Sequence, residues 1–201
     1  MLKTENSLPT TSHVDMPTPQ DVFPRIKTTR LILREITAAD APALLAIYSD
    51  ASAMRWFGCD AMTELAAANK LVDIFAQWRI QPNPGTRWGI EYDGNFIGSC
   101  GLFKWDRNWQ SCHIGYELAP SHQGLGLMNE ALLAILAWGF KHMALNRIHG
   151  QVHPQNIASI KSLQSLGFIQ EGCFREAGFW NGQYHDLLQF ALLRSGYKPA
   201  I

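Results

Sequence analysis

The 201-residue sequence lacks several features that mark common classes of protein. Its 17 basic and 17 acidic residues balance, which excludes the strong positive field of a general nucleic-acid-binding protein. It has no Cys-x-x-Cys pair and no close cluster of histidines, which argues against a metal site of the zinc type. It shows neither a secretory leader nor a long apolar run, and we therefore expect a cytoplasmic protein with no membrane partner.

Cysteine itself is scarce. The four cysteines, Cys59, Cys100, Cys112 and Cys173, lie far apart in the chain. Scattered cysteines in a chain without a secretory leader are typical of reduced thiols, not of a disulfide framework. We therefore expect all four to be free.

The chain length suits one domain with a core of its own. Residues 1–24 stand apart, because prolines interrupt a polar stretch that has no sustained hydrophobic period. We expect residues 1–24 to form a flexible or draped N-terminal extension, and residues 25–201 to form the domain.

The most informative stretch that the sequence does contain is a glycine turn at residues 121–131, SHQGLGLMNEA. Residues 111–118 before it alternate between apolar and polar, which is typical of a strand, and apolar residues after it recur at helical spacing. A glycine turn that opens a helix leaves backbone N–H groups unpaired at the positive end of the helix dipole. The stretch therefore predicts a phosphate-binding site, with an ordinary helix start as the alternative.

Hydrophobic periods and turn residues predict the other elements. We expect a first strand at 31–33, a helix capped by Thr37 or Asp40, and a second helix between 63 and 79. Two strands, 88–92 and 96–105, should be joined by a tight turn at Asp93-Gly94. After the long helix we expect a strand at 147–152, a helix capped by Asn156, and a final hairpin, 168–177 with 184–193, in which Gly178 could end the first strand early.

A dinucleotide-binding fold is the rival interpretation of a glycine turn. It requires Gly-x-Gly-x-x-Gly in an early parallel strand-helix-strand unit. Here position 129 is Asn, and the strands before the turn are joined by hairpins. Both observations argue against that rival.

The order of elements and the motifs together resemble the GNAT acetyltransferase superfamily. The motifs are TRLILR at 29–34, IGYEL at 114–118, QGLGLMNEA at 123–131, NIAS at 156–159 and LGF at 166–168. Their order is similar to that of the RimJ/RimL-like branch of ribosomal-protein N-terminal acetyltransferases, over roughly residues 23–193. The resemblance implies a single α/β (α+β) domain with a mixed, mostly antiparallel twisted sheet, flanked by helices and containing a splayed central strand pair.

The resemblance also implies that acetyl-CoA is the co-substrate and that no metal is needed. Amides of the glycine turn would hold the pyrophosphate, and the pantetheine arm would lie between the splayed strands. Met128 departs from the superfamily pattern at the last turn position. The implied acetyl-CoA-binding residues are Leu118, Ala119, Gln123, Gly124, Leu125, Gly126, Leu127, Met128, Asn156 and Ser159, with one N–H near Leu118 and Ala119 at the thioester oxygen.

Amine activation needs a group that accepts a proton, because an amine is mostly protonated at neutral pH. His113 and Glu117 share the polar face of the strand before the glycine turn, and both are candidates. RimJ/RimL-like chains usually carry a glutamate at the position of His113, and a solvent-facing histidine is the alternative. Ser159 stands where the family places a serine that can donate to the thioester sulfur, or it only starts its helix. Leu163 replaces the tyrosine that many members use one turn later.

A second departure concerns the acceptor side. Some members carry an acid after an Arg-Glu-Ala run, whereas here Gly178 follows, and Glu176 could substitute only if the local chain path permits. Aromatic residues border the acceptor mouth in such folds, and the candidates here are Trp56, Phe57, Phe179 and Trp180. A protein N-terminus or a compact amphipathic amine would suit such a pocket better than a polycationic aminoglycoside.

We therefore expect an N-acetyltransferase that moves the acetyl group of acetyl-CoA to a primary amine by direct attack, without a covalent enzyme intermediate. The acceptor would be a protein N-terminal α-amine or a small-molecule amine. The alternative is a non-catalytic acyl-CoA-binding module of the same fold, suggested by the missing glutamates. We expect a monomer or homodimer that binds no nucleic acid.

Overall fold

The computed structural model describes residues 23–80 and 85–198. Most of the N-terminal extension predicted at residues 1–24 lies outside these ranges. Its last residue is anchored to the domain, because the Pro24 carbonyl accepts a 2.6 Å hydrogen bond from the indole N–H of Trp88.

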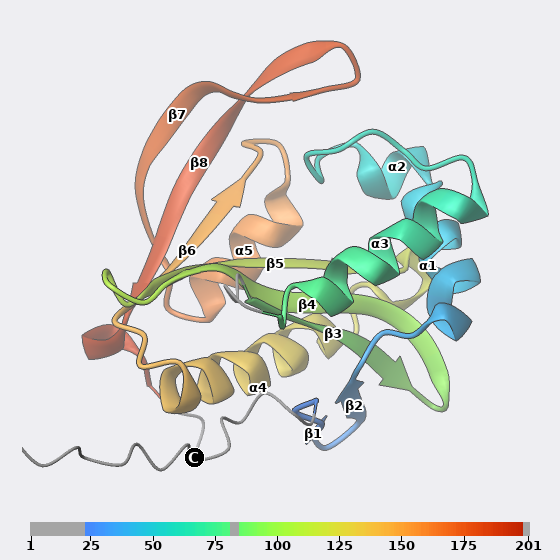
Figure 1. The fold of residues 1–201 in the computed structure, drawn as a ribbon. Helices are drawn as coiled ribbons and strands as arrows, with labels where there is room; N and C mark the ends of the chain where they lie inside the picture. Colours follow the sequence, from blue (N-terminus) through green and yellow to red (C-terminus); the bar gives the residue numbers. More distant parts are fainter. Residues whose placement is uncertain (1–22, 81–84, 199–201) are drawn as a thin grey trace, which may run out of the picture.

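One eight-stranded sheet runs through the molecule in the order β1-β2-β3-β4-β5-β6-β8-β7 (Figure 1). Neighbouring strands are antiparallel except β5 and β6, which are parallel. The predicted mixed, mostly antiparallel sheet is confirmed. The strands are β1 (Ile26–Lys27), β2 (Leu31–Arg34), β3 (Gly85–Tyr92), β4 (Asn95–Asp106), β5 (Ser111–Leu118), β6 (Arg147–Val152), β7 (Ile169–Trp180) and β8 (Gln183–Leu193).

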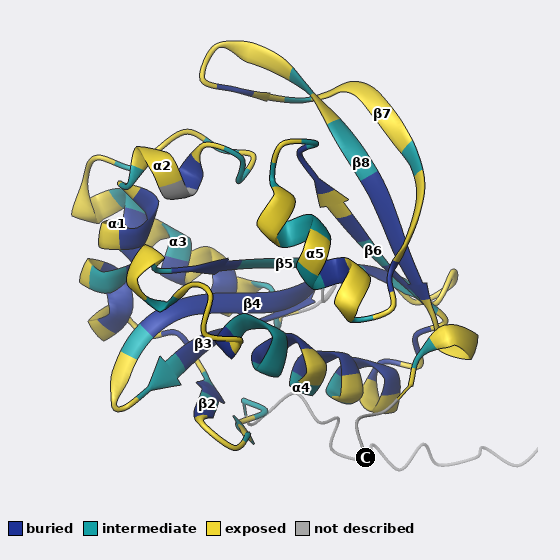
Figure 2. Ribbon diagram, turned by 180° about the vertical axis from the view of Figure 1, so that it is seen from behind, coloured by how far each residue is buried: buried dark blue, intermediate teal, exposed yellow. Residues whose placement is uncertain are grey.

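Helices cover both faces of this sheet (Figures 1 and 2). One face carries α1 (Ala41–Tyr48), α2 (Ala51–Met54) and α3 (Leu65–Gln77), and the other carries α4 (Leu127–His142) and α5 (Ile157–Ser165). Successive side chains of β4 point to opposite faces of the sheet and pack under the helices on each face. Leu102 lies against Gly139 of α4, whereas the next residue, Phe103, stacks on Trp78 at the end of α3 with ring centroids 5.3 Å apart. Figure 2 shows the buried central strands between these layers.

The turn residues shape the chain as predicted. Asp93 and Gly94 have φ of 48° and 76°, and Asn181 and Gly182 have φ of 49° and 69°, the left-handed pairs that tight hairpins require. The short helix α2 was not predicted. The suggestion that Gly178 ends its strand early is wrong, because β7 continues to Trp180.

The central strand pair is splayed, as predicted. Parallel pairing between β5 and β6 runs only from Ser111 opposite Arg147 to His113 opposite His149. Beyond this point each strand continues without the other, so a wedge opens between them.

All four cysteines are free thiols, as predicted. The abundant aromatic residues divide between core and surface, since Trp88 is fully buried whereas Trp109 is 80% exposed. Within residues 23–80 and 85–198, none of the helices has the length and apolar character needed to cross a membrane.

Candidate active site

The glycine turn leaves a row of backbone N–H groups unused at the start of α4. Gly124 and Gly126 adopt left-handed conformations, with φ of 77° and 73°. Within the described ranges, the backbone N–H groups of residues 124–129 donate to no protein acceptor, and the first helical bond runs from the Glu130 N–H to the Gly126 carbonyl at 3.1 Å. The turn can therefore bind an anion through several amides at the positive end of the helix.

Arg30 braces this turn from the β1–β2 bend. Its Nε donates to Glu130 at 2.7 Å, and its Nη1 donates to the Leu125 carbonyl at 3.0 Å. The Thr28 hydroxyl also donates to the Glu130 carboxylate, at 2.6 Å. The negative charge of Glu130, in the first turn of α4, is thereby compensated by Arg30 beside the anion site. Sequence reasoning missed Arg30, because nothing local links it to a turn so distant in the chain.

Gln123 and Met128 flank the turn without obstructing it. The Gln123 amide donates to the Leu118 carbonyl at 3.0 Å, so this side chain fixes the path from β5 into the turn. Met128 is partly buried and packs against the main core. Its departure from the superfamily pattern therefore leaves the start of α4 open.

The open edge of β5 faces the wedge. The Ala119 N–H donates to the Ile97 carbonyl at 2.8 Å, so of the two residues near which an N–H was expected to meet the thioester oxygen, Ala119 has its N–H already engaged. Backbone groups alternate between the two sides of a strand, so those of Leu118, Tyr116 and Ile114 face away from β4 and toward β6. This edge runs directly from the wedge to the glycine turn.

A small cavity of about 70 Å³ occupies the wedge, and we call it the wedge cavity. Four of the predicted site residues, Trp56, Phe57, Asn156 and Ser159, line it. The Asn156 side chain accepts a 3.1 Å hydrogen bond from the Ser159 N–H, as expected of an N-cap, and places Ser159 in the first turn of α5.

Tyr116 also lines the wedge cavity and was not predicted as a site residue. Its hydroxyl donates to the Ser159 carbonyl at 3.3 Å. Burial raises the pKa of Tyr116 to about 12, so the phenol stays protonated at neutral pH and keeps its proton for a hydrogen bond. The period-two pattern of β5 assigned Tyr116 to an apolar face, which concealed this role.

Glu117 does not face the cleft, and this corrects the prediction of a shared polar face with access to the acceptor. Its side chain is buried and is held by Arg87 and the Ser99 hydroxyl. Burial raises the pKa of Glu117, while Arg87 acts in the opposite direction. A carboxylate enclosed in this way is tied to Arg87 within the core and cannot exchange protons freely with an amine.

His113 lies at the apex of the wedge, in the last pair that joins β5 to β6. Its ring lies 5.0 Å from that of His149 and 5.8 Å from that of Phe103, and it has no hydrogen-bond partner among the described residues. Burial lowers the pKa of His113 to about 4, with further lowering by His149 and Lys104. His113 is therefore uncharged at neutral pH and a weaker base than the imidazole near neutrality that the sequence suggested.

Three acceptor candidates lie on the β7–β8 hairpin: Glu176, Phe179 and Trp180. Of these, the described structure places only Trp180 against the segment that contains Trp56. Trp180 is 3% exposed, and its Nε1 donates to the Arg55 carbonyl at 3.2 Å. In contrast, Phe179 is 61% exposed. Glu176 is exposed at a break in the β7 register, and its N–H donates to Asp186 at 2.8 Å. The structure does not bring Phe179 or Glu176 to the wedge cavity.

No group of histidine, cysteine and acidic side chains within residues 23–80 and 85–198 is arranged to hold a metal ion.

Comparisons with known proteins agree with this geometry. The family model described as an acetyltransferase (GNAT) domain matches residues 30–169. The uncharacterized N-acetyltransferase YoaA of Bacillus subtilis is 33% identical over 175 residues, which cover 86% of this chain and 98% of that protein.

Solved structures show the same fold. A RimL ribosomal L7/L12 alpha-N-protein acetyltransferase in complex with coenzyme A superposes with a TM-score of 0.77 at 24% identity, covering 85% of this chain and 98% of that one. A Vibrio cholerae spermidine N-acetyltransferase in complex with CoA and spermine gives a TM-score of 0.73 at 23% identity, covering 85% of this chain and 99% of that one.

Proposed function

The chain belongs to the GNAT acetyltransferase family, whose members use acetyl-CoA, and we propose that its wedge transfers the acetyl group to a primary amine. One observation carries the proposal. The unused amides of the glycine turn lie at the end of the open β5 edge, and that edge leads into the wedge cavity. The glycine turn can hold a pyrophosphate, the open β5 edge can pair with a pantetheine arm, and the wedge cavity can enclose a thioester.

In this proposal the donor binds through backbone groups. The amides of residues 124–128, which include Leu125 and Leu127, hold the pyrophosphate, and Arg30 offsets the charge of Glu130 nearby. The pantetheine amides pair with the open edge of β5 and with Asn156. Since the Ala119 N–H is engaged, an N–H of Tyr116 or Leu118 is the donor for the thioester oxygen.

The chemical step is a direct displacement. The amine nitrogen forms a bond to the acetyl carbon, the bond from that carbon to sulfur breaks, and one proton leaves the nitrogen. Neutral His113 accepts this proton, directly or through water, once attack has made the nitrogen acidic. The Ser159 hydroxyl donates a hydrogen bond to the departing thiolate, which then takes a proton from solvent, and Tyr116 holds the Ser159 backbone in place through its hydrogen bond to the Ser159 carbonyl.

Three of the four thiols are unsuited to covalent catalysis. Burial raises the pKa of Cys59 to about 11 and those of Cys100 and Cys112 to about 12. A thiol nucleophile acts as its thiolate, so these three cysteines are unsuited to forming an acetyl-enzyme intermediate at neutral pH.

The names of the two structural neighbours give different acceptors, which are a ribosomal protein N-terminus for RimL and spermidine for the Vibrio cholerae enzyme. Both are primary amines, and this chain would take one as well. Trp56 and Phe57 close the end of the wedge beside the acetyl group and exclude water from it.

Release of the CoA thiol from acetyl-CoA, measured over a panel of N-terminal peptides, amino acids, polyamines and amine antibiotics, tests the proposal. We expect thiol release that depends on at least one primary amine. Tight binding of CoA with no release for any amine would instead support a non-catalytic acyl-CoA-binding module.

A further inference from the structure

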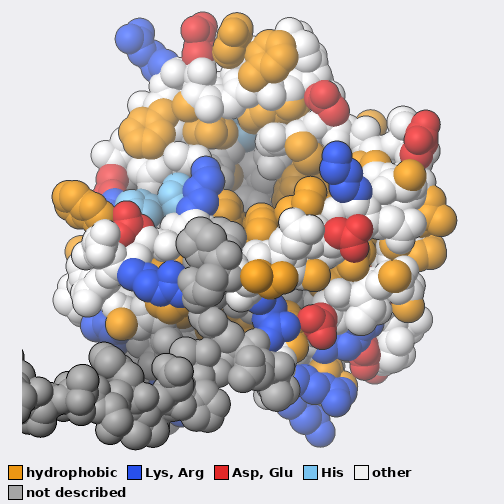
Figure 3. All heavy atoms as spheres, viewed as in Figure 1, with side chains coloured by type: hydrophobic (Ala, Val, Ile, Leu, Met, Phe, Trp, Pro, Cys, Tyr) orange, Lys and Arg blue, Asp and Glu red, His pale blue; other side chains and the backbone are white. Residues whose placement is uncertain are grey.

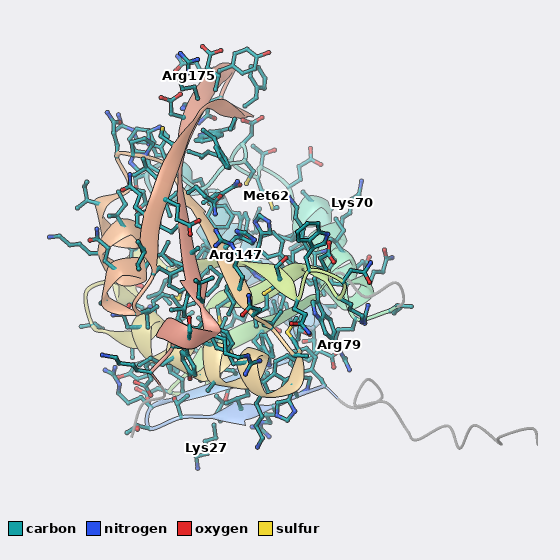
Figure 4. All side chains as sticks on the ribbon, turned by 90° about the vertical axis from the view of Figure 1, so that its left-hand side faces the viewer. Lys27, Met62, Lys70, Arg79, Arg147 and Arg175 are labelled. Carbon is teal, nitrogen blue, oxygen red and sulfur yellow. The ribbon has the colours of Figure 1, made fainter. Side chains whose placement is uncertain are left out.

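His153 lies where three parts of the chain meet at the end of the wedge. It belongs to the loop between β6 and α5 and is 8% exposed. Figure 3 shows a hollow below the β7–β8 hairpin with hydrophobic side chains at its margin, and in Figure 1 the hairpin tip reaches toward the segment after α2. In Figure 4, Arg147 lies toward the base of the hairpin, whereas Arg175 lies in its outer part. His153 meets the hairpin beyond Arg175, at Trp180 and His185.

The imidazole ring of His153 is stacked on Trp56. The ring centroids are 4.1 Å apart, and the ring planes differ by 14°. Trp180 and His185 meet the same imidazole at steep angles, with centroids 5.9 Å and 5.3 Å away. The described wall of the wedge cavity includes Trp56 and not His153. His153 therefore lies behind the tryptophan and supports its ring from outside the cavity.

Two hydrogen bonds hold the segment that contains Trp56 to the hairpin. The Trp180 indole N–H donates to the Arg55 carbonyl at 3.2 Å, and the Asn181 N–H donates to the Asp60 carboxylate at 2.6 Å. These bonds fix the chain on both sides of Trp56. The stacked imidazole then fixes the direction of the Trp56 side chain.

The second contact of His153 sets the start of α5. Its Nδ1 accepts a 3.1 Å hydrogen bond from the Gln155 N–H, and its carbonyl accepts one of 2.9 Å from the Asn156 N–H. A side-chain acceptor that binds the N–H two residues later is the arrangement of an Asx turn. The turn leads directly into Asn156, whose side chain caps α5 and places Ser159.

The imidazole of His153 is neutral at neutral pH. Burial lowers its pKa, and the neighbouring His185 and Arg55 lower it further, whereas Asp186 acts in the opposite direction. A neutral ring can keep a lone pair on Nδ1, and the hydrogen bond from Gln155 requires this lone pair. Both contacts of the ring can therefore form at the same time.

We propose that His153 is a positioning residue for acetyl transfer, which holds Trp56 over the thioester with its ring and fixes the start of α5 with its Nδ1. The inference rests on the proposed transfer and adds a residue that lies behind the wall of the wedge cavity. Without the stack, Trp56 can turn away and water can attack the acetyl carbon, so that the bond to sulfur breaks and acetic acid and the CoA thiol form. Without the Nδ1 acceptor, Asn156 and Ser159 are less well placed for CoA.

Two substitutions separate the two contacts. His153→Asn retains an acceptor for the Gln155 N–H but removes the ring, whereas His153→Phe retains a ring but removes the acceptor. With the panel amine that wild-type protein acetylates fastest, acetic acid formed per acetylated amine should rise roughly three- to tenfold in His153→Asn and not in His153→Phe. Isothermal titration should show CoA affinity lowered roughly three- to tenfold in His153→Phe and unchanged in His153→Asn.

His142→Asn is the matched control, because the His142 ring also lies beside a tryptophan, 5.3 Å from that of Trp138, on α4. It should change neither the product ratio nor the CoA affinity. A second test adds His153→Asn to Trp56→Ala. Because the imidazole acts through Trp56, the double variant should form no more acetic acid than Trp56→Ala alone.

Equal effects of His153→Asn and His153→Phe on both measurements would overturn the assignment, as would a further rise of acetic acid in the double variant. If wild-type protein acetylates none of the amines, the proposed transfer itself fails, and hydrogen exchange of the amides at residues 55–60 tests the stack alone. Faster exchange in His153→Asn than in His153→Phe would support the stack as the support of Trp56, and equal exchange would overturn it.

Discussion

The indole of Trp180 occupies the space that a side chain at residue 178 would need. A Cβ on Gly178 would lie 2.4 Å from Cζ3 of Trp180, and that indole is buried against the Arg55 carbonyl. The acid that the family resemblance led us to seek at this position therefore cannot coexist with the indole as it lies. The missing base and the buried tryptophan are two aspects of one local arrangement.

Gly178→Ala should lower the free energy of unfolding by about 1–3 kcal/mol, because the new methyl group displaces Trp180. The matched control on the same strand is Gly172→Ala, where an added Cβ meets no atom within 4 Å. The control should be neutral or slightly stabilising. Urea denaturation of both variants checks the difference, and equal effects would contradict the contact.

Glu117→Gln should cost roughly 3–5 kcal/mol of stability, since it leaves the Arg87 guanidinium buried without its counter-charge. Thermal unfolding followed by circular dichroism measures the loss. A change of less than about 1 kcal/mol would show that the ion pair contributes little to folding.

A double variant separates structure from chemistry at this pair. Arg87→Met with Glu117→Leu removes both charges and should restore most of the stability lost in Glu117→Gln. If Glu117 acts only through folding, acetyl transfer should return with stability. A double variant that is as stable as wild type yet inactive would place Glu117 in the reaction.

Gly126→Asp should weaken CoA binding by about tenfold or more, because it puts a carboxylate where the pyrophosphate binds and strains a left-handed residue. Gly94→Asp is the control, since Gly94 has φ of 76° against 73° for Gly126 and lies in the β3–β4 turn. Isothermal titration with CoA should detect a loss of affinity only in Gly126→Asp. Normal binding by that variant would remove the pyrophosphate assignment.

The pH dependence of transfer should reflect the acceptor and not His113. With a pKa of about 4, His113 stays neutral while an α-amine titrates near pH 8, so kcat/KM should rise with pH up to the amine pKa. His113→Asn should lower kcat/KM roughly 100-fold without moving this inflection. A wild-type inflection near pH 6.5 that the variant loses would show a histidine with an ordinary pKa.

Stability should fall as the pH falls from about 6.5 to about 4. His113 binds its proton more weakly in the folded state than in the unfolded state, so in this window the unfolded state takes up more protons. The loss from this residue is at most about 3 kcal/mol. Chemical denaturation at several pH values should show a shallower dependence for His113→Gln, and an identical slope would contradict the lowered pKa.

Local sequence signals predicted most of the fold. The Asp93-Gly94 and Asn181-Gly182 turns, the Asn156 cap and the glycine turn all act within a few residues, so their chemistry can be read directly from the chain. The splayed strands came from the resemblance, and the structure confirms them.

Features that depend on side chains meeting across strands could not be predicted in the same way. The alternating pattern of β5 placed Glu117 on a polar face, but it could not show that Arg87 from β3 covers that carboxylate. The contact between His149 and Gln189 likewise requires β6 and β8 to lie side by side. Such pairings follow from topology and register, not from the residues on one strand.

The most direct test of the account is the fate of the acetyl group. Wild-type protein is incubated with acetyl-CoA labelled in the acetyl carbon and with a primary amine that supports thiol release, and the products are separated by mass spectrometry. The account predicts labelled acetylated amine in equal amount to free CoA, no label on the protein, and loss of both products in Gly126→Asp. Label recovered as acetate, or attached to the protein as an intermediate, would contradict direct transfer to an amine.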